Sequence, residues 1–443
     1  MISKNNGSFP TASKPIGDTN PLEFYRRVES HPVSLTPFVV GFHFSSRTII
    51  VLVSVRFFLQ DPQAGVVAGL ALNFLLLLIV FFQSIGTAQT RIRPMLGLQP
   101  MKWVLAFLCF SGCSLLWTGA VSLGAAAVFW TAMASDLGMV ALLMRRGSIA
   151  DISAALMRGY VWGACAVALS AWMLPPQSDL RLGDETLLGP NQIGYACAFA
   201  LFFAQYLYRV RGRFWIAPAI FLGITLLRTL SKTSIVALVA AETFILFRDR
   251  SLGWRAKALM IGAAGCVVAA FSSLISAYFA IYTNAGSQAE TLTGRFGIWA
   301  YFLDKALEQP WIGHGFHSVW KVVPPFSEDF EARHAHNELL QQFYAYGGVG
   351  VVLFFGLYGS LLHQIRKLPR GSLKTFFLGM LMFVLIRGLA DTEPFDLSLP
   401  LWAVLLVCAI QSSAEPIPLP AMTTVQSSGF AAGQVPHSDR AGA

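Results

Sequence analysis

The sequence predicts an all-α polytopic inner-membrane protein with about 12 transmembrane helices and one large periplasmic loop. Its 443 residues are 55% hydrophobic and only 12% charged, with a mean hydropathy of +0.58, which lies outside the range of soluble globular domains. The apolar residues recur in runs of roughly 18–24, the length that a helix needs to cross about 30 Å of hydrocarbon. These two observations exclude a soluble enzyme.

Twelve apolar runs are predicted as spans, and residues 37–282 hold the first nine of them. A cytoplasmic polar segment (1–36) precedes these runs, and a hydrophilic loop (283–344), three further spans (345–412) and a disordered cytoplasmic tail (413–443) follow. We expect no secretory signal peptide, because the polar start lacks a short apolar core. The spans lie near residues 37–59, 64–86, 103–119, 122–144, 157–174, 192–208, 214–230, 233–247, 257–282, 345–362, 374–390 and 397–412.

Loop charges predict the orientation of these spans. Basic residues gather in alternate loops: Arg91, Arg93, Lys102, Arg145, Arg146, Arg158, Arg209, Arg211, Arg213, Arg248, Arg250, Arg255, Lys257, Arg366, Lys367, Arg370 and Lys374. The positive-inside rule then puts both termini in the cytoplasm and the loop 283–344 on the periplasmic side. The net charge of +9 therefore belongs to short connectors in contact with the lipid bilayer, and we predict no nucleic-acid partner. A cytosolic nucleotide-dependent enzyme is also disfavoured, because no Walker-type loop occurs on the inner side.

The long outer loop opens with a glycine-arginine pair followed by an amphipathic stretch. Arg295 stands beside an aromatic run, and Trp299, Phe302, Leu303 and Leu307 are expected along one side of a helix at the membrane surface. Arg295 is a candidate anion-binding residue. The alternative is an ordinary contact of Arg295 with lipid headgroups.

Two histidines at the end of this loop are candidate proton acceptors. His334 and His336 lie between Arg333 and Asn337 at a membrane–water boundary, and imidazole can accept a proton from a hydroxyl near neutral pH. Arg333, His334 and Asn337 are also candidate diphosphate- or substrate-binding residues. A metal site that also drew on His314 and His317 is an alternative. It is disfavoured because a His-X-His pair on a helix would point its rings about 200° apart. A third interpretation is that the histidines only bond backbone groups at a helix start.

A cation-rich turn between two spans is a candidate phosphate site. Arg228 and Lys232 flank hydroxyl groups that include Ser231, and a helix N-terminus there would add free N–H groups. Asn191 is a candidate for binding sugar hydroxyls, although a role in capping a helix is preferred at this stage. Asp391, with Glu393 and Asp396, is expected to pair with Arg387 or to serve as a base. The alternative for the cations is snorkelling to the interface.

Taken in order, these motifs resemble the O-antigen ligase and Wzy-type polysaccharide polymerase superfamily. They look like the family's Asn-Gly motif, its Ser-Arg/Lys element, its Gly-Arg…Trp…Pro-x-x-Gly-x-Gly signature and its His-Asn…Leu…Gly-x-x-Gly close. The matching residues are Leu188-Gly189-Pro190-Asn191-Gln192-Ile193-Gly194; Ser231-Lys232-Thr233-Ser234; Gly294-Arg295 with Trp299 and then Pro310-Trp311-Ile312-Gly313-His314-Gly315; and His336-Asn337 with Leu340 and then Tyr346-Gly347-Gly348-Val349-Gly350.

The resemblance implies a metal-independent glycosyl transfer at the periplasmic face, without a cofactor. The donor would be a glycan linked to undecaprenyl diphosphate, and the acceptor a second glycan or a lipid. Arg295 and the basic residue of the Ser-Arg/Lys element would contact the diphosphate, and His336 would assist attack by an acceptor hydroxyl. Many relatives carry Arg where this chain has Lys232, so the resemblance leaves open whether Lys232 or Arg228 takes that contact. A chain-length regulator is a further candidate partner.

Three functions remain open on the sequence. The Ser-Lys-Thr-Ser form and the segment Phe316-His317-Ser318-Val319-Trp320 resemble exopolysaccharide polymerases more than ligases, which favours polymerisation of repeat units. A ligase that transfers the glycan to lipid A–core or another acceptor is the alternative. A membrane transporter is a distant third, because the halves of the chain show no repeat and the polar residues concentrate at the outer face.

Overall fold

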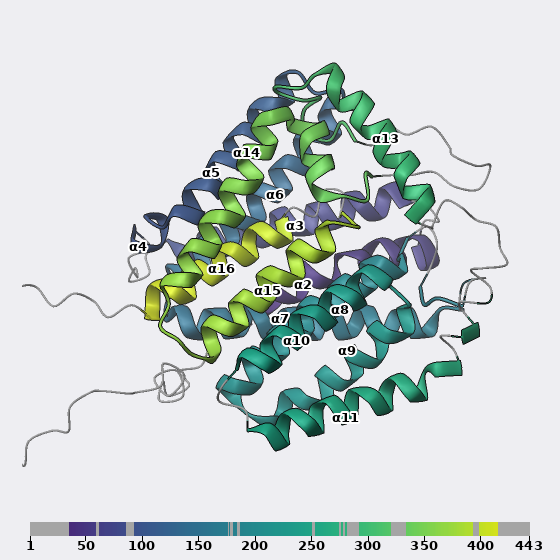
Figure 1. Ribbon diagram of the computed structural model, residues 1–443. Coiled ribbons are helices and arrows are strands. Elements are labelled where there is room, and N and C mark those ends of the chain that lie inside the picture. Colours follow the sequence, from purple (N-terminus) through teal and green to yellow (C-terminus); the bar gives the residue numbers. More distant parts are fainter. Residues whose placement is uncertain are drawn as a thin grey trace, which may run out of the picture.

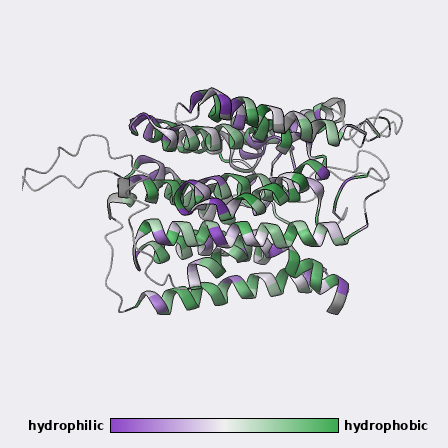
Figure 2. Ribbon diagram, turned by 90° about the horizontal axis from the view of Figure 1, so that it is seen from below, coloured by the Kyte–Doolittle hydropathy of each residue, from purple (hydrophilic) through white to green (hydrophobic). Residues whose placement is uncertain are grey.

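The described part of the chain is a bundle of helices, seen from two directions in Figures 1 and 2. The computed structural model describes residues 35–58, 62–85, 93–175, 180–183, 187–249, 253–273, 292–319, 334–392 and 398–414, with a few isolated residues besides. No β-strand occurs among them. Hydrophobic residues cover most of the length of the helices in Figure 2, as expected of segments that face lipid or one another.

A described helix overlaps each of the twelve predicted spans. They are α2 (Leu35–Val53), α3 (Pro62–Ser84), α5 (Gln99–Cys113), α6 (Leu123–Met144), α7 (Ile149–Met173), α8 (Pro190–Arg211), α9 (Ile216–Thr229), α10 (Lys232–Arg248), α11 (Trp254–Ala270), α14 (Glu338–Lys367), α15 (Ser372–Gly388) and α16 (Ser398–Ala414). Of these helices, α11 ends well before the predicted end of its span at residue 282. The chain also forms α4 (Arg93–Leu96) and α13 (Leu292–Glu308).

Seven of the described helices are long and apolar enough to cross a membrane by length and composition. They include α7 and α8, which are the most buried, and α14, which runs on from the outer loop. The shorter apolar helices leave the total of twelve spans a prediction. Both termini and the segments 283–291 and 320–333 of the outer loop lie outside the described residues.

The packing places α8 near the centre of the bundle. Tyr195, Phe199 and Phe202 on α8 lie against Phe383 of α15, with ring centroids 5.4–6.2 Å apart. On another side, Phe203 of α8 contacts Tyr160 of α7 at 5.1 Å. A core of interlocking aromatic rings therefore fixes α8 and α15, whose ends reach the polar groups described below.

The first span contains polar residues that are paired inside the bundle. His43 of α2 faces Asn73 of α3, with Nε2 3.2 Å from Oδ1, and Arg47 donates to Asp136 of α6 at 2.6 Å. Asp136 is completely buried. Pairing lowers the cost of charge in an apolar environment, which explains how a helix interrupted by His43 and Arg47 still forms. These four residues are an exception to the prediction that polar groups gather at the outer face.

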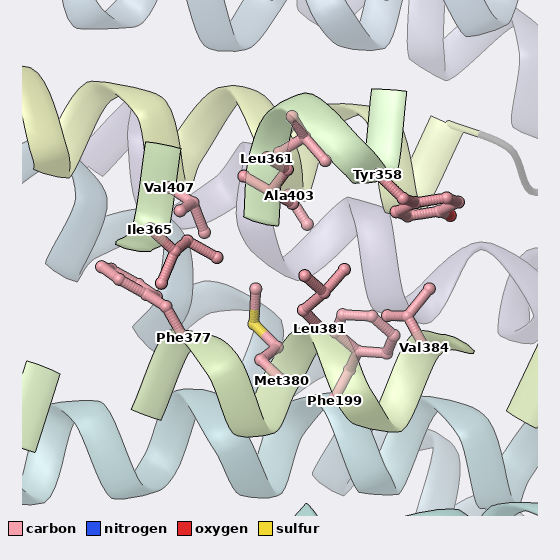
Figure 3. A pocket seen from close by; sticks show the side chains of 11 residues that line it. Phe199, Tyr358, Leu361, Ile365, Phe377, Met380, Leu381, Val384, Ala403 and Val407 are labelled. Carbon is pink, nitrogen blue, oxygen red and sulfur yellow. The ribbon is translucent and has the colours of Figure 1, made fainter. Parts of the chain in front are cut away.

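A small apolar cavity lies between α8, α14, α15 and α16 (Figure 3). Its lining includes Phe199, Tyr358, Met380 and Val384, and its exposed lining is apolar. The cavity therefore exposes no polar side-chain atom for binding or chemistry. The polar clusters at the helix ends are the candidates for a functional site.

Candidate functional site

The histidine pair lies in a turn and not on a helix. α14 begins at Glu338, with Asn337 as its N-cap: the Asn337 side chain accepts from the Leu340 N–H at 3.0 Å. His336 has a positive φ of 48°, which turns its ring back towards His334, so that the two ring centroids lie 4.0 Å apart. The prediction that the two rings would diverge is therefore wrong, because it assumed a helical backbone.

Asp391 lies beside this pair, three residues after the end of α15. Its Oδ1 is 3.5 Å from His336 Nδ1, and its Oδ2 accepts from Arg387 at 3.2 Å and from the Thr233 hydroxyl at 3.3 Å. The carboxylate is buried, and the expected pairing with Arg387 is confirmed. Glu393 and Asp396 lie outside the described residues.

His334 is held by a different set of partners. Its Nδ1 lies 2.9 Å from the Thr392 hydroxyl oxygen, and that hydroxyl also contacts Gln341 Oε1 at 3.1 Å. The His336 N–H faces the same His334 nitrogen at 3.3 Å. Each histidine is thus fixed by one of two consecutive residues, Asp391 and Thr392, which follow α15.

Arg295 reaches the same end of α15 from the outer loop. Its guanidinium donates to the Ala390 carbonyl, and the Asn337 side-chain amide donates to the Leu389 carbonyl at 3.0 Å. Arg295 therefore contacts the residue that directly precedes Asp391 in the chain. Arg333, the remaining cation predicted in this region, lies outside the described residues.

The helix that carries Arg295 packs on α14 through a face that the sequence placed incorrectly. Ile298, Phe302 and Ala306 of α13 are buried, and Phe302 contacts Tyr344 with ring centroids 5.3 Å apart. Leu303 and Leu307 are exposed on another side. Phe302 therefore belongs to the packing face, because α14 rather than lipid covers it.

The turn between α9 and α10 forms a second polar cluster. The Asn191 side-chain oxygen, at the start of α8, accepts from Ser231 and from Arg181, both at 2.9 Å. Ser231 also contacts Ser234 at 3.2 Å. Asn191 therefore does not cap α8, whose N-cap is Gly189. It ties a loop arginine to the start of α10.

The two predicted cations of this turn differ in their surroundings. Arg228, in the last turn of α9, donates to the Leu180 carbonyl and is half-buried. Lys232 is exposed at the first position of α10, next to the N-cap Ser231. The partial positive charge of a helix N-terminus adds to that of Lys232. An anion approaching from outside the bundle would meet Lys232 before Arg228.

The two polar clusters are joined by Arg387. Its Nε lies 3.4 Å from the Ser234 hydroxyl, its Nη2 bonds Asp391, and its guanidinium lies 3.9 Å above the ring of Tyr195. The structure thus brings Asn191, Ser231, His334, His336 and Arg295 into one hydrogen-bonded region. Sequence reasoning did not include Arg387, Arg181, Thr392 and Gln341 among the site residues. Of these four residues, only Arg387 had a signal in the sequence, which is its i, i+4 spacing from Asp391.

The glycine motifs of the outer loop have a structural role. The segment Pro310–Gly315 docks on α14 through backbone bonds, including Gly315 N–H to Ala345 O at 2.8 Å and Gly348 N–H to Pro310 O at 2.7 Å. α14 is kinked at Gly347, which has φ 61° and ψ −152°. His314 stacks on Tyr344 and His317 lies against Phe129. These two histidines therefore belong to the docked segment and not to the pair at His334 and His336.

The electrostatics favour a charged carboxylate beside neutral imidazole. Burial acts to raise the pKa of Asp391, but Arg387 and the adjacent histidines outweigh it and hold that pKa well below its usual range. Burial, with His336 beside it, holds the pKa of His334 well below its ordinary value. Asp391 is thus ionised and His334 neutral near neutral pH.

A divalent cation is the alternative use of this cluster. The ligating atoms of His334, His336 and Asp391 lie within 4.8 Å of one another. The Arg387 guanidinium on Asp391 and the hydroxyl of Thr392 on His334 already engage two of these groups. A fixed positive charge on the carboxylate opposes cation binding, so we assign no metal ligands here.

Comparisons with known proteins bear on the family. Residues 217–355, from α9 to the first half of α14, match the family model of O-antigen ligase. The predicted resemblance is confirmed. The matched region contains Ser231, Lys232, Arg295, His334 and His336 and ends before Asp391.

Two curated relatives carry names within the same superfamily. The chain is 27% identical over 321 residues to the exopolysaccharide production protein ExoQ of Rhizobium meliloti. The aligned region covers 64% of this chain and 70% of that protein. The chain is 28% identical over 258 residues to an O-antigen ligase of Pseudomonas aeruginosa, which covers 56% of this chain and 57% of that protein. The chain is thus similar to proteins named for O-antigen ligation and for exopolysaccharide production, and its apolar helices are those of a membrane protein.

Proposed function

We propose that this protein polymerises undecaprenyl-diphosphate-linked oligosaccharide repeat units into exopolysaccharide or O-antigen at the periplasmic face of the inner membrane. The observation that carries the proposal is the joining of a carboxylate–histidine pair to a cationic turn within one hydrogen-bonded region. An acceptor hydroxyl oxygen attacks the anomeric carbon of the donor sugar. The bond from that carbon to the diphosphate oxygen breaks, and undecaprenyl diphosphate leaves.

His336 takes the proton of the acceptor hydroxyl. Its Nδ1 faces the Asp391 carboxylate at 3.5 Å, so we assign the ring proton to Nδ1 and the free electron pair to Nε2. A buried carboxylate at the far nitrogen also stabilises the imidazolium that forms on proton transfer. General base assistance of this kind contributes roughly 10²–10⁴-fold to a rate.

Cations receive the diphosphate as it leaves. Arg295 donates one N–H to the Ala390 carbonyl, and a guanidinium carries five N–H donors in all, so others can face the diphosphate. Lys232 and the N-terminus of α10 supply further positive charge. Because negative charge grows on the leaving oxygen, these groups stabilise the transition state more than the ground state.

A ligase is the second candidate function. The family model and the relative from Pseudomonas aeruginosa carry the name O-antigen ligase. A ligase would use the same donor chemistry and pass the glycan to lipid A–core or another acceptor. The site geometry described above serves both reactions, so the acceptor must be tested directly.

The test is complementation of a strain that lacks the gene. Arg295→Ala and His336→Ala are compared with the intact gene, and membrane levels are checked by immunoblot. Arg370→Ala and His363→Ala serve as matched controls, because both side chains are exposed near the opposite end of α14. The lipid-linked repeat units and the surface polymer are analysed together.

Each candidate function predicts a different pattern of products. For a polymerase, both site variants insert normally, polymer disappears and single lipid-linked units accumulate, while the controls make polymer. For a ligase, polymer is still made but is no longer attached to its acceptor. Unchanged, attached polymer in both site variants would show that Arg295 and His336 are structural.

A further inference from the structure

We propose that Arg387 is a positioning residue, which couples the serine-rich start of α10 to the histidine pair and holds Asp391 in line with His336. This inference rests on the proposed function and deepens it by naming a residue that aligns the base without touching the sugar. Arg387 lies in the last turn of α15 and its side chain is 5% exposed.

The contacts of Arg387 point in two directions. The Nη2 nitrogen donates to Asp391 Oδ2 at 3.2 Å, and the Nε nitrogen lies 3.4 Å from Ser234 Oγ. Ser234 continues through Ser231 to Asn191. A planar guanidinium can donate to partners on both sides at once, whereas the single ammonium of a lysine acts as a point charge.

An aromatic ring fixes the plane of this guanidinium. The Arg387 Cζ lies 3.9 Å from the centroid of the Tyr195 ring, and Tyr195 is itself buried and packed on Phe199 and Phe383. A cation over an aromatic face gains more where water is excluded. Arg387 is therefore oriented by the core of α8 and α15 and transmits that orientation to Asp391.

The charge around Asp391 depends on Arg387. The groups that face the carboxylate are His334 and His336 from the turn before α14, Thr233 from α10, Glu338 at the start of α14, and Arg295 through the neighbouring carbonyl. Among the groups that lower the pKa of Asp391, Arg387 makes the largest contribution. Without it, burial would favour the protonated acid, which no longer orients the imidazole N–H.

This predicts a shift of the acidic limb of the pH–rate profile. The rate requires Asp391 to be ionised and His336 to be unprotonated. In Arg387→Met, the Asp391 carboxylate loses the charge that keeps it ionised and protonates at a higher pH. The acidic limb therefore moves to higher pH. A purely structural loss would lower the amount of active protein and leave the limb in place.

The experiment uses the purified full-length protein in detergent micelles. The substrate is the lipid-linked repeat unit extracted from the strain lacking the gene, and its consumption is followed from about pH 5 to pH 9. Arg387→Met should lower kcat about 10²-fold, as expected for misplacing a catalytic group by about an ångström, and move the acidic limb upward. Arg370→Met, an exposed arginine, should match the wild type.

Arg387→Lys keeps the inference testable if Arg387→Met does not fold. The lysine preserves the positive charge but loses the planar set of N–H donors. The acidic limb of the pH–rate profile should therefore stay in place while kcat falls about tenfold. Arg387→Met with the wild-type limb, or Arg387→Lys with the wild-type kcat, would overturn the inference. If the wild-type protein consumes no repeat units, the polymerase proposal itself fails.

Discussion

At the scale of single residues, one carboxylate organises the histidine turn. Asp391 lies between the Arg387 side chain and the His336 ring, and its Oδ1 also accepts from the Thr392 N–H at 3.0 Å. The neighbouring Thr392 then contacts His334. Two consecutive residues after a helix therefore set the positions of both imidazoles, including that of the proton acceptor proposed above.

Asp391→Asn tests the energetic side of this arrangement. The substitution leaves Arg387 buried without its counter-ion, and breaking a buried pair costs about 3–5 kcal/mol. The folded-state pKa of Asp391 is depressed. Its stabilisation is therefore fully present above the ordinary pKa of about 4 and is lost only as the pH falls through the folded value. The variant should unfold at a clearly lower temperature at neutral pH, measured by thermal denaturation in detergent.

Glu308→Gln is the matched control for Asp391→Asn. The Glu308 carboxylate pairs with Lys305 at 2.6 Å, but it is 53% exposed, and exposed pairs contribute little because water screens them. Its melting temperature should equal that of the wild type. Equal melting temperatures for Asp391→Asn and the wild type would contradict the view that the pair with Arg387 stabilises the fold.

At the scale of elements, α14 consists of two helical segments with different tasks. Residues before Gly347 follow the histidine turn and contact α13 through Tyr344. Residues after it continue as a span to Lys367. The kink exposes backbone groups that receive the segment Pro310–Gly315. The segment Pro310–Gly315 is thereby fixed to α14 by main-chain bonds, and α13 brings Arg295 to the site.

Gly347→Ala should release this docked segment. An added Cβ would lie 2.3 Å from the Trp311 carbonyl carbon, and φ 61° is a left-handed conformation that costs other residues roughly 1–3 kcal/mol. Gly348→Ala is the neighbouring control, because its nearest atom would be 3.6 Å away. We expect faster limited proteolysis of the outer loop and loss of transfer for Gly347→Ala only. Equal proteolysis of the two variants would show that the docking does not depend on Gly347.

At the scale of the whole molecule, the sequence predicts helices better than contacts. Hydropathy located a helix at each apolar run, because a segment's tendency to enter lipid or the protein core depends on its local composition. It could not show that Arg387 reaches Ser234, which lies 153 residues away. Nor could it place His336 off the helix, because that depends on Asn337 as the N-cap. The partners of a site residue are set by packing, which no local pattern contains.

Orientation in the membrane is the whole-molecule property that remains to be measured. The positive-inside rule places α13 in the periplasm and the connector between α14 and α15 in the cytoplasm. Cysteines introduced at Glu308 and at Arg370, both exposed, should therefore differ in their reaction with a membrane-impermeant maleimide. In intact spheroplasts the cysteine at 308 should be labelled, and the one at 370 only after permeabilisation. The parent chain, with its native cysteines, provides the background.

An exposed connector on the predicted cytoplasmic side gives this experiment an independent check. Arg213, between α8 and α9, is also exposed, and a cysteine there should behave like the one at 370. Labelling at 213 and 370 with protection at 308 would show that the chain has the opposite orientation. Arg295 and His336 would then lie on the cytoplasmic side. Donor and acceptor glycans would then have to react before export, so the periplasmic reaction proposed here depends on this result.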